Sequence, residues 1–327
     1  MNELLINGFS NLNNPAILFF VLGFIASIIR SDIKIPESIV KILSIYLMIS
    51  IGYKGGYEIS HSGMSDDLLK SFFISLIISV VTTTLVFVTI YHLLKKDSLN
   101  AGAIAAHYGS VSVVTFITAV SFLDKISVEY NSYIVGMLAI MESPAILIAL
   151  LFVKFFNKSN TGGEVTNFKE IFKEALFNGS IVLLFGSLLI GFVTGSKGYN
   201  LISPFFVTPF QGVLTLFLLE MGMIAGKRIE EFKTVGLKLG IVAILFPIIN
   251  GIIGVLLASF IGLNLGTTTL FGVLAASSSY IAAPAAVRLA LPKANPIYYI
   301  TMSLAITFPF NIILGIPLYY SLSSMLQ

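Results

Sequence analysis

Residues 239–287 read LGIVAILFPIINGIIGVLLASFIGLNLGTTTLFGVLAASSSYIAAPAAV and contain no Lys, Arg, Asp or Glu. A helix needs about 20 apolar residues to cross the hydrocarbon core of a bilayer. These 49 residues are therefore long enough for two spanning helices, with a turn expected at residues 262–266. The stretch predicts an all-α membrane protein.

The composition of the whole chain supports this class. Of 327 residues, 56% are hydrophobic and 11% are charged, whereas soluble domains carry about 25% charged residues. The mean hydropathy is +0.96. The chain has no Cys, which excludes thiolate metal sites, disulfides and cysteine nucleophiles. Its charges lie between the apolar runs, so the net charge of +3 does not indicate nucleic-acid binding.

Other charge-poor runs complete a set of ten predicted spans. Boundaries read from sequence are good to about four residues. The spans are 14–30, 40–59, 70–94, 99–123, 132–156, 175–196, 202–226, 235–261, 267–291 and 296–322.

The two halves of the chain are predicted to be repeats, because short blocks recur in order about 170 residues later. Five helices per half is an odd number, so the halves enter the membrane from opposite sides. Inverted repeats of this kind are typical of secondary transporters. We expect a first repeat over 1–157, a cytoplasmic linker over 158–174 and a second repeat over 175–327. The matches are VLGFIAS (21–27) with LIGFVTG (189–195), Gly52 and Gly56 with Gly222 and Gly226, Gly102 with Gly272, and LAI (138–140) with LAI (304–306).

The basic residues predict the orientation. Of the 19 Lys and Arg residues, 15 fall on one side of the ten spans and four on the other. Cytoplasmic loops carry the excess of Lys and Arg. We therefore expect an inner (plasma) membrane protein with both termini outside the cytoplasm, and with the loop 157–174 inside it.

Spans four and nine contain equivalent polar segments that favour broken helices: AAHYGSVSVVTFITA (105–119) and AASSSYIAAPAAVRLALP (275–292). Gly109 and Pro284 can each interrupt a helix. New half-helices would then start at about Ser110 and near Pro284, and helix N-termini bind anions. Hydroxyls and freed carbonyls at such breaks suit sodium, a hard cation. The alternative is that these hydroxyls only pack or bond to their own helix. The hydroxyl residues are Ser110, Ser112, Thr115, Ser277, Ser278 and Ser279.

Other intramembrane polar residues are candidates as well. A buried carboxylate is costly, so Glu142 is interpreted as a cation ligand or proton acceptor, or else as a protonated group bonded to backbone freed by Pro144. Thr307 and Asn311 flank Pro309 and are candidate cation ligands, unless they satisfy carbonyls that Pro309 leaves open. Glu220 lies near Lys227 and Arg228, so we interpret it as interfacial.

Enzymatic function is not expected. His107 precedes Ser110 by three residues, but a hydrolytic dyad needs contact between base and nucleophile, and no second motif supports hydrolysis. The chain has no Walker motif, so nothing indicates an ATP-driven pump.

Several blocks of the sequence form a pattern that covers both halves in order. The blocks are PAILFFVLGFIAS with IPESI (15–39), ISIGYKGGYEI (49–59), HYGSVSVVTF (107–116), MESPAIL (141–147), MGMIAGKRI (221–229) and AASSSYIAAPAAVRLALPKANPIYY (275–299). The most specific of them is AASSS followed by a proline, an arginine and P-x-A-N-P. Together these blocks resemble the sodium-dependent bicarbonate transporter family.

The resemblance implies a ten-helix, five-plus-five inverted repeat in which a transport domain moves against a gate or scaffold domain. It implies a homotrimer that takes up bicarbonate with co-transported sodium and needs no organic cofactor. By motif, the implied anion site is Gly109, Ser110 and Val111 with Ala282, Ala283, Pro284 and Ala285. The implied sodium site is Ser112, Thr115, Ser277 and Ser278.

The chain also departs from the well-known cyanobacterial members. They carry an aspartate after the three serines, where this chain has Tyr280, and an aspartate where it has Glu142. They bind a PII-type regulator on the cytoplasmic face, which is an open possibility here. Two other functions stay open: a cation/proton exchanger that uses Glu142, and a non-transporting membrane receptor or partner.

Overall fold

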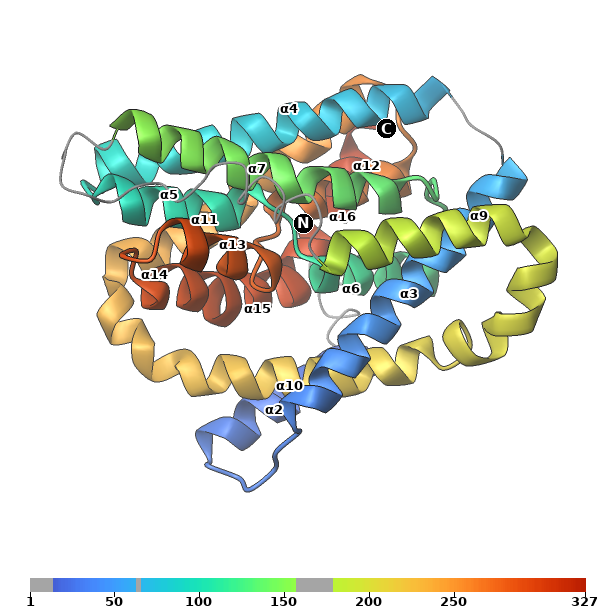
Figure 1. Cartoon of the computed structure of the whole chain (residues 1–327), viewed down its shortest axis with the longest axis horizontal. Helices are drawn as coiled ribbons and strands as arrows, with labels where there is room; N and C mark the ends of the chain where they lie inside the picture. The colour runs from blue at the N-terminus through green and yellow to red at the C-terminus, as the bar shows by residue number, and fades with distance from the viewer. Residues whose placement is uncertain (1–13, 63–65, 157–178) are drawn as a thin grey trace.

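The computed structural model describes residues 14–62, 66–156 and 179–327 (Figure 1). Within these ranges all regular elements are helical, which confirms the all-α class. Seven helical segments of the described chain are long and apolar enough to cross a membrane. Two shorter apolar helices, α2 (Pro15–Ile28) and α12 (Leu265–Ala276), accompany them. The predicted count of ten spans stays a prediction, and the linker at 158–174 lies outside the described residues.

Four helices form one group, which we call the frame: α2, α3 (Glu37–Ser62), α9 (Gly179–Phe206) and α10 (Phe210–Lys227). Within it α3 packs along α9, and α2 packs along α10. Glycines allow both pairs to approach closely. A methyl group on Gly56 would lie 1.9 Å from the carbonyl oxygen of Leu188, and one on Gly222 would lie 2.0 Å from that of Phe20.

The other helices pack into a second group, which we call the bundle. In Figure 1 the blue and yellow helices of the frame run along its lower and right-hand sides. The short helix η2 (Arg228–Glu231) joins α10 of the frame to the bundle. The helices of the bundle are α4 (Asp66–Val88) with η1 (Thr89–Leu93), α5 (Ser98–Gly109), α6 (Val113–Lys125), α7 (Ile134–Phe156), α11 (Phe232–Phe260), α12, α13 (Ala282–Ala290), α14 (Pro296–Ile300), η3 (Thr301–Thr307), α15 (Phe308–Phe310), η4 (Asn311–Gly315) and α16 (Ile316–Met325).

The predicted start of span seven is wrong, whereas the predicted end of span six at residue 196 falls at a bend of the chain. We expected span seven to begin at residue 202, but α9 continues to Phe206 and α10 begins at Phe210. The chain bends at Gly195, whose φ of +51° is open to glycine because it lacks a Cβ atom. The arm beyond the bend is held to α3, because the Tyr46 ring stacks on Phe206 at 5.3 Å and its hydroxyl donates to the Phe205 carbonyl.

Candidate functional site

Two helices of equal length lead into the candidate site. The helices α5 and α12 each have 12 residues. Each starts at an Asx cap: Asp97 accepts the Asn100 N–H at 2.9 Å, and Asn264 accepts the Thr267 N–H at 2.9 Å. A side-chain cap satisfies N–H groups that a helix start leaves open. The caps therefore fix where each helix begins and where its far end lies.

The first of these helices stops where a break was expected, but its partner starts later than predicted. The helix α5 ends at Gly109, Ser110 is extended, and α6 begins at Val113 rather than at about Ser110. The reason is the cap, because the Ser112 hydroxyl accepts the Thr115 N–H at 3.2 Å. Gly109 itself is tightly packed, since a methyl group there would lie 1.8 Å from the Thr83 hydroxyl oxygen.

The second break lies at residues 277–281. Ser277 is extended after the end of α12, and α13 starts at Ala282, two residues before Pro284. No side chain caps α13 at Ile281, although the Ser279 hydroxyl accepts the Ala283 N–H at 3.1 Å. Ala285 lies within α13, and Ala283 and Pro284 are buried.

The two broken segments touch each other, and we call residues 107–112 with 277–279 the crossing. The Ser112 N–H donates to the Ser277 hydroxyl at 2.9 Å. The carbonyl of His107 accepts two bonds from the other segment, from the Ser279 N–H at 2.8 Å and from the Ser278 hydroxyl at 3.2 Å. The structure thus brings together three of the four residues implied for sodium, while Thr115 contacts the crossing through its backbone N–H.

The crossing is buried and rich in oxygen atoms. Its serines, Ser110, Ser112, Ser277, Ser278 and Ser279, are 1–4% exposed. Hydroxyl and carbonyl oxygens are the ligands that sodium-like hard cations take. The described residues contain no cluster of three or more His, Cys, Asp or Glu side chains, so a cation here would have to use these oxygens.

Span-ten residues support the second break. The Asn311 amide donates to the carbonyl of Ala276, the last residue of α12, at 2.9 Å. The hydroxyl of Tyr319 donates to the Asn311 side-chain oxygen at 3.2 Å. Thr307 donates to the Ala243 carbonyl at 2.6 Å and lies 2.6 Å from the Tyr108 hydroxyl. The two candidate cation ligands, Asn311 and Thr307, therefore already make hydrogen bonds to other protein groups around the second break.

Glu142 lies beside the first break. Its side chain is 2% exposed, and its Oε2 atom has no hydrogen-bond partner among the described residues. The backbone carbonyl of Glu142 accepts the Ser110 hydroxyl at 3.1 Å. His107 instead places its Nδ1 atom 2.7 Å from the Ala103 carbonyl. No hydrogen bond joins His107 to Ser110 in the described chain, and the His107 Nε2 atom has no hydrogen-bond partner there.

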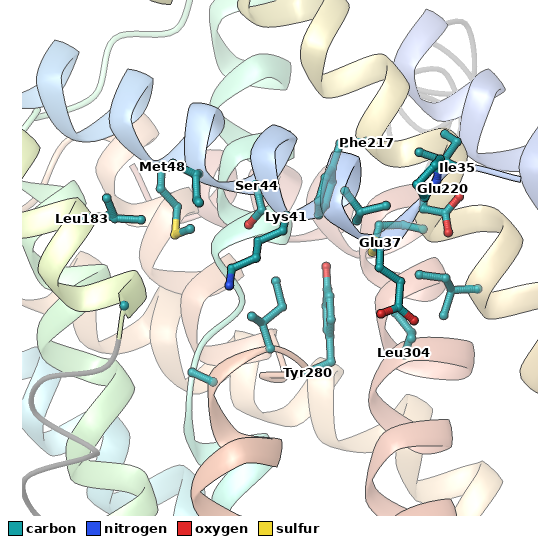
Figure 2. Close-up of a pocket in the computed structure, with 18 of the residues that line it drawn as sticks. Ile35, Glu37, Lys41, Ser44, Met48, Leu183, Phe217, Glu220, Tyr280 and Leu304 are labelled. Carbon is teal, nitrogen blue, oxygen red and sulfur yellow. The ribbon is translucent and has the colours of Figure 1, made fainter.

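A cavity of about 1250 Å³ lies between the frame and the bundle. Its basic residues are Lys34, Lys41 and Lys227, all on the side predicted to be cytoplasmic. Figure 2 shows the side chains of Lys41 and Tyr280 reaching into the same space. Glu220 also lines this cavity; it is 6% exposed, and its Oε2 atom has no hydrogen-bond partner in the described chain. It interacts electrostatically with Lys227, which the sequence placed near it.

The cavity reaches the second break at Tyr280, Ile281 and Ala282. The sequence identified Ala282 as a candidate but treated Tyr280 only as a departure from the cyanobacterial members. Tyr280 packs edge-on against Phe308 at 5.2 Å, and its buried hydroxyl lies near the side chain of Ser112 without a hydrogen bond of normal geometry in the described chain. A tyrosine directly after three serines in a break was the available signal.

Comparison with known proteins places the chain in a family. Comparison with curated proteins gives no match. The family model of the Na⁺-dependent bicarbonate transporter superfamily matches residues 15–324, which is nearly the whole chain and includes both breaks. The chain, a multi-pass helical membrane protein, therefore belongs to the Na⁺-dependent bicarbonate transporter superfamily.

Proposed function

We propose that the chain takes up a small anion, bicarbonate by family expectation, together with sodium. The observation that carries the proposal is the crossing: two broken helices meet through Ser112 and Ser277, and a cavity reaches the second break from the basic side. Broken helices at such a meeting point are how secondary transporters expose helix ends and carbonyls to a solute.

The oxygen atoms of the crossing support sodium as the coupling ion. The sodium ligands in this proposal are Ser112, Thr115, Ser277 and Ser278, with Glu142 and Asn311 close to the two breaks. The anion would lie against the starts of α6 and α13, where helix N-termini offer about half a positive charge each. Its proposed contacts are Gly109, Ser110, Val111, Ala282, Ala283, Pro284 and Ala285.

Uptake into proteoliposomes tests the function. Labelled bicarbonate and a panel of other small anions would be offered with and without an inward sodium gradient. We expect bicarbonate uptake that depends on sodium. The proposal would be contradicted if no anion were taken up under either condition, or if the rate of uptake did not depend on the sodium gradient.

Removing single hydroxyl groups from the crossing should weaken the binding of sodium. Ser112→Ala and Ser277→Ala are each expected to raise the half-maximal sodium concentration for uptake, because each loses an oxygen ligand with little change in volume. Ser112→Ala also loses its helix cap, which typically contributes about 1 kcal/mol, so its folding must be checked separately. The matched control is Ser323→Ala, a buried serine of α16 whose hydroxyl donates to the Tyr319 carbonyl at 2.8 Å. If the half-maximal sodium concentration were unchanged in both variants, these hydroxyls would have a packing role and would not be sodium ligands.

An inverted relation between the halves is part of the proposal. It is supported by the equal lengths and caps of α5 and α12, 167 residues apart, and by the exchanged pairing of α3 with α9 and of α2 with α10. Residues 1–157 should superpose on 170–327 by a rotation of about 180° about an axis in the membrane plane.

The proposed transport movement is a displacement of the bundle against the frame, as in an elevator. Polar contacts hold the two groups together at the C-terminal end of α3, while the cavity opens at its N-terminal end. Lys54 of α3 lies 3.5 Å from Asp124 of α6, and Ser132, which precedes α7, donates to Glu58 of α3. Tyr130 donates to Asp124 at 3.2 Å. Burial, helped by the carboxylates of Asp124 and Glu58, raises the pKa of Tyr130, so the phenol stays a donor at neutral pH.

Weakening these contacts should favour the state in which the cavity is closed. In a Ser44→Cys variant, the double change Lys54→Ala with Glu58→Ala is expected to lower the ratio of open to closed states roughly 1.4- to 5-fold, since exposed ion pairs contribute about 0.2–1 kcal/mol, and so to slow labelling of the cavity by a thiol reagent by up to that factor. The absence of native Cys makes the probe unique. Lys70→Ala is the control, because Lys70 pairs with Asp67 at 3.2 Å within α4 alone. Faster or unchanged labelling would contradict the movement.

The proposed orientation puts both termini outside the cytoplasm, as the 15-to-4 distribution of basic residues predicts. Asn2→Cys and Gln327→Cys should react with an impermeant thiol reagent in intact cells, whereas exposed Lys154→Cys should react only after lysis. The reverse pattern would contradict it. The inner-membrane location, the homotrimer and a PII-like regulator stay predictions from kinship.

A cation/proton exchanger is the second candidate, and the unpartnered, buried Oε2 atom of Glu142 is the observation that favours it. Exchange would acidify or alkalinise proteoliposomes when sodium is added without any anion. Glu142→Gln should abolish that pH change, whereas a symporter would give no pH change to abolish.

A further inference from the structure

We infer that Tyr280 is the gate between the cavity and the crossing, and that its hydroxyl donates a hydrogen bond to the arriving anion. Only the second part of the inference, the hydrogen bond to the anion, rests on the proposed function. The first part, a closed passage at one side chain, follows from geometry and needs no transported solute.

The cavity stops at Tyr280. Of residues 277–282, the cavity is lined by Tyr280, Ile281 and Ala282 but not by the three serines. Ser277, Ser278 and Ser279 are only 1–3% exposed, although they directly precede Tyr280 in the chain. A solute that enters from the basic end therefore meets the tyrosine before any oxygen of the crossing.

The ring of Tyr280 is held in position by other aromatic rings. It packs edge-on against Phe308 at 5.2 Å, and Phe308 packs edge-on against Phe20 of α2 at 5.6 Å. This row runs from the break, through the bundle, to the frame. A movement of the bundle against the frame would disturb the contact between Phe308 and Phe20, and with it the support behind the gate.

The hydroxyl of Tyr280 fits an anion. Its oxygen makes no hydrogen bond of normal geometry in the described chain and lies near the side chain of Ser112, so it stands between the cavity and the crossing. Figure 2 shows the ring reaching toward the space also reached by Lys41. Buried hydroxyls almost always have a hydrogen-bond partner, so one without such a bond beside a cavity can donate to a ligand. A neutral phenol donates to an anion without adding negative charge. The cavity wall carries three lysines, Lys34, Lys41 and Lys227, against two glutamates, Glu37 and Glu220, and an excess of positive charge attracts anions.

The gate is tested by labelling, independently of transport. In the chain, which lacks native Cys, Ser277→Cys should react slowly with a small thiol reagent applied to the purified protein. Adding Tyr280→Ala should speed this reaction at least about tenfold, because the ring no longer covers the crossing. Ser44→Cys, on the cavity wall, should react equally with and without Tyr280→Ala, which shows that the cavity itself is unchanged. Tyr298→Ala, in α14 and absent from the cavity lining, is the matched tyrosine control. Equal labelling of Ser277→Cys with and without Tyr280 would overturn the gate.

The hydrogen bond is tested with Tyr280→Phe, which keeps the ring. Labelling of Ser277→Cys should stay slow, while the half-saturating bicarbonate concentration for uptake should rise roughly 2- to 13-fold, the range for one net hydrogen bond. An unchanged half-saturating concentration would overturn the donor role. If the unsubstituted protein moves no bicarbonate, the proposed function fails, and the labelling result still decides whether Tyr280 is a gate.

Discussion

Titration of the purified protein with bicarbonate is expected to show binding when sodium is present and binding about 5- to 150-fold weaker when choline replaces it. This range corresponds to a coupling free energy of about 1–3 kcal/mol, which is typical of linked sites. Sodium should gain the same factor in affinity from the anion, because coupling in binding is reciprocal.

The physical reason is the lack of a fixed cation at the crossing. None of the buried polar residues in the described chain is Lys or Arg. An anion taken into hydrocarbon without a counter-charge is strongly disfavoured. The starts of α6 and α13 offer about half a positive charge each, and a sodium ion held by Ser112 and Ser277 would add a full one.

Lys41→Ala is the control for this titration. Lys41 lies in the cavity and not at the crossing, so its loss should weaken anion binding in both salts and leave their ratio unchanged. Calorimetry gives both affinities directly. If the anion bound with equal affinity in sodium and in choline, the result would contradict sodium-coupled symport and favour a cation/proton exchanger or a non-transporting receptor.

Adding one methyl group at either of two equivalent glycines should destabilise the frame. Gly23 and Gly191 are matched in the repeat, 168 residues apart. A Cβ atom would lie 2.0 Å from the Leu219 carbonyl oxygen at Gly23, and 2.2 Å from that of Tyr53 at Gly191. Backbone atoms cannot rotate away, so Gly23→Ala and Gly191→Ala must push helix pairs apart. Overpacking typically costs about 1–3 kcal/mol, and here we expect the upper end.

Gly186→Ala is the same chemical change on α9 with no heavy atom within 4 Å. It should leave stability unchanged or raise it, because alanine is favoured over glycine in helices by about 1 kcal/mol. Thermal unfolding in detergent would compare the three variants, with a fall of roughly 5–10 °C expected for Gly23→Ala and Gly191→Ala. A Gly23→Ala protein that melts like Gly186→Ala would show that α2 and α10 do not approach so closely.

Local features of the sequence were sufficient to predict the all-α membrane class, the positions of the two helix breaks and the family resemblance. Charge-free runs such as 239–287 predicted the helices, because the length needed to cross a bilayer is a property of one segment. Ser110 lies in the first break and the three serines at 277–279 lie in the second. Both breaks could be read from the sequence, because Gly109, Pro284 and the serine caps influence the helix only within a few residues. The start of α6 was missed by three residues, since the Ser112 cap rather than Gly109 sets it. The start of α13 was missed by two residues, since the helix already begins at Ala282, ahead of Pro284.

Only the tertiary structure decided which distant groups meet. The amide of Asn311 bonds to the carbonyl of Ala276, and the N–H of Ser112 bonds to the hydroxyl of Ser277, 165 residues away. The bend at Gly195 and the position of Tyr280 in the cavity wall likewise depend on neighbours from other helices. A hydrophobic pattern specifies that a helix is buried, but many packings bury the same apolar surface. The choice among them is made by close glycine contacts and paired polar groups, which exist only once the helices are together.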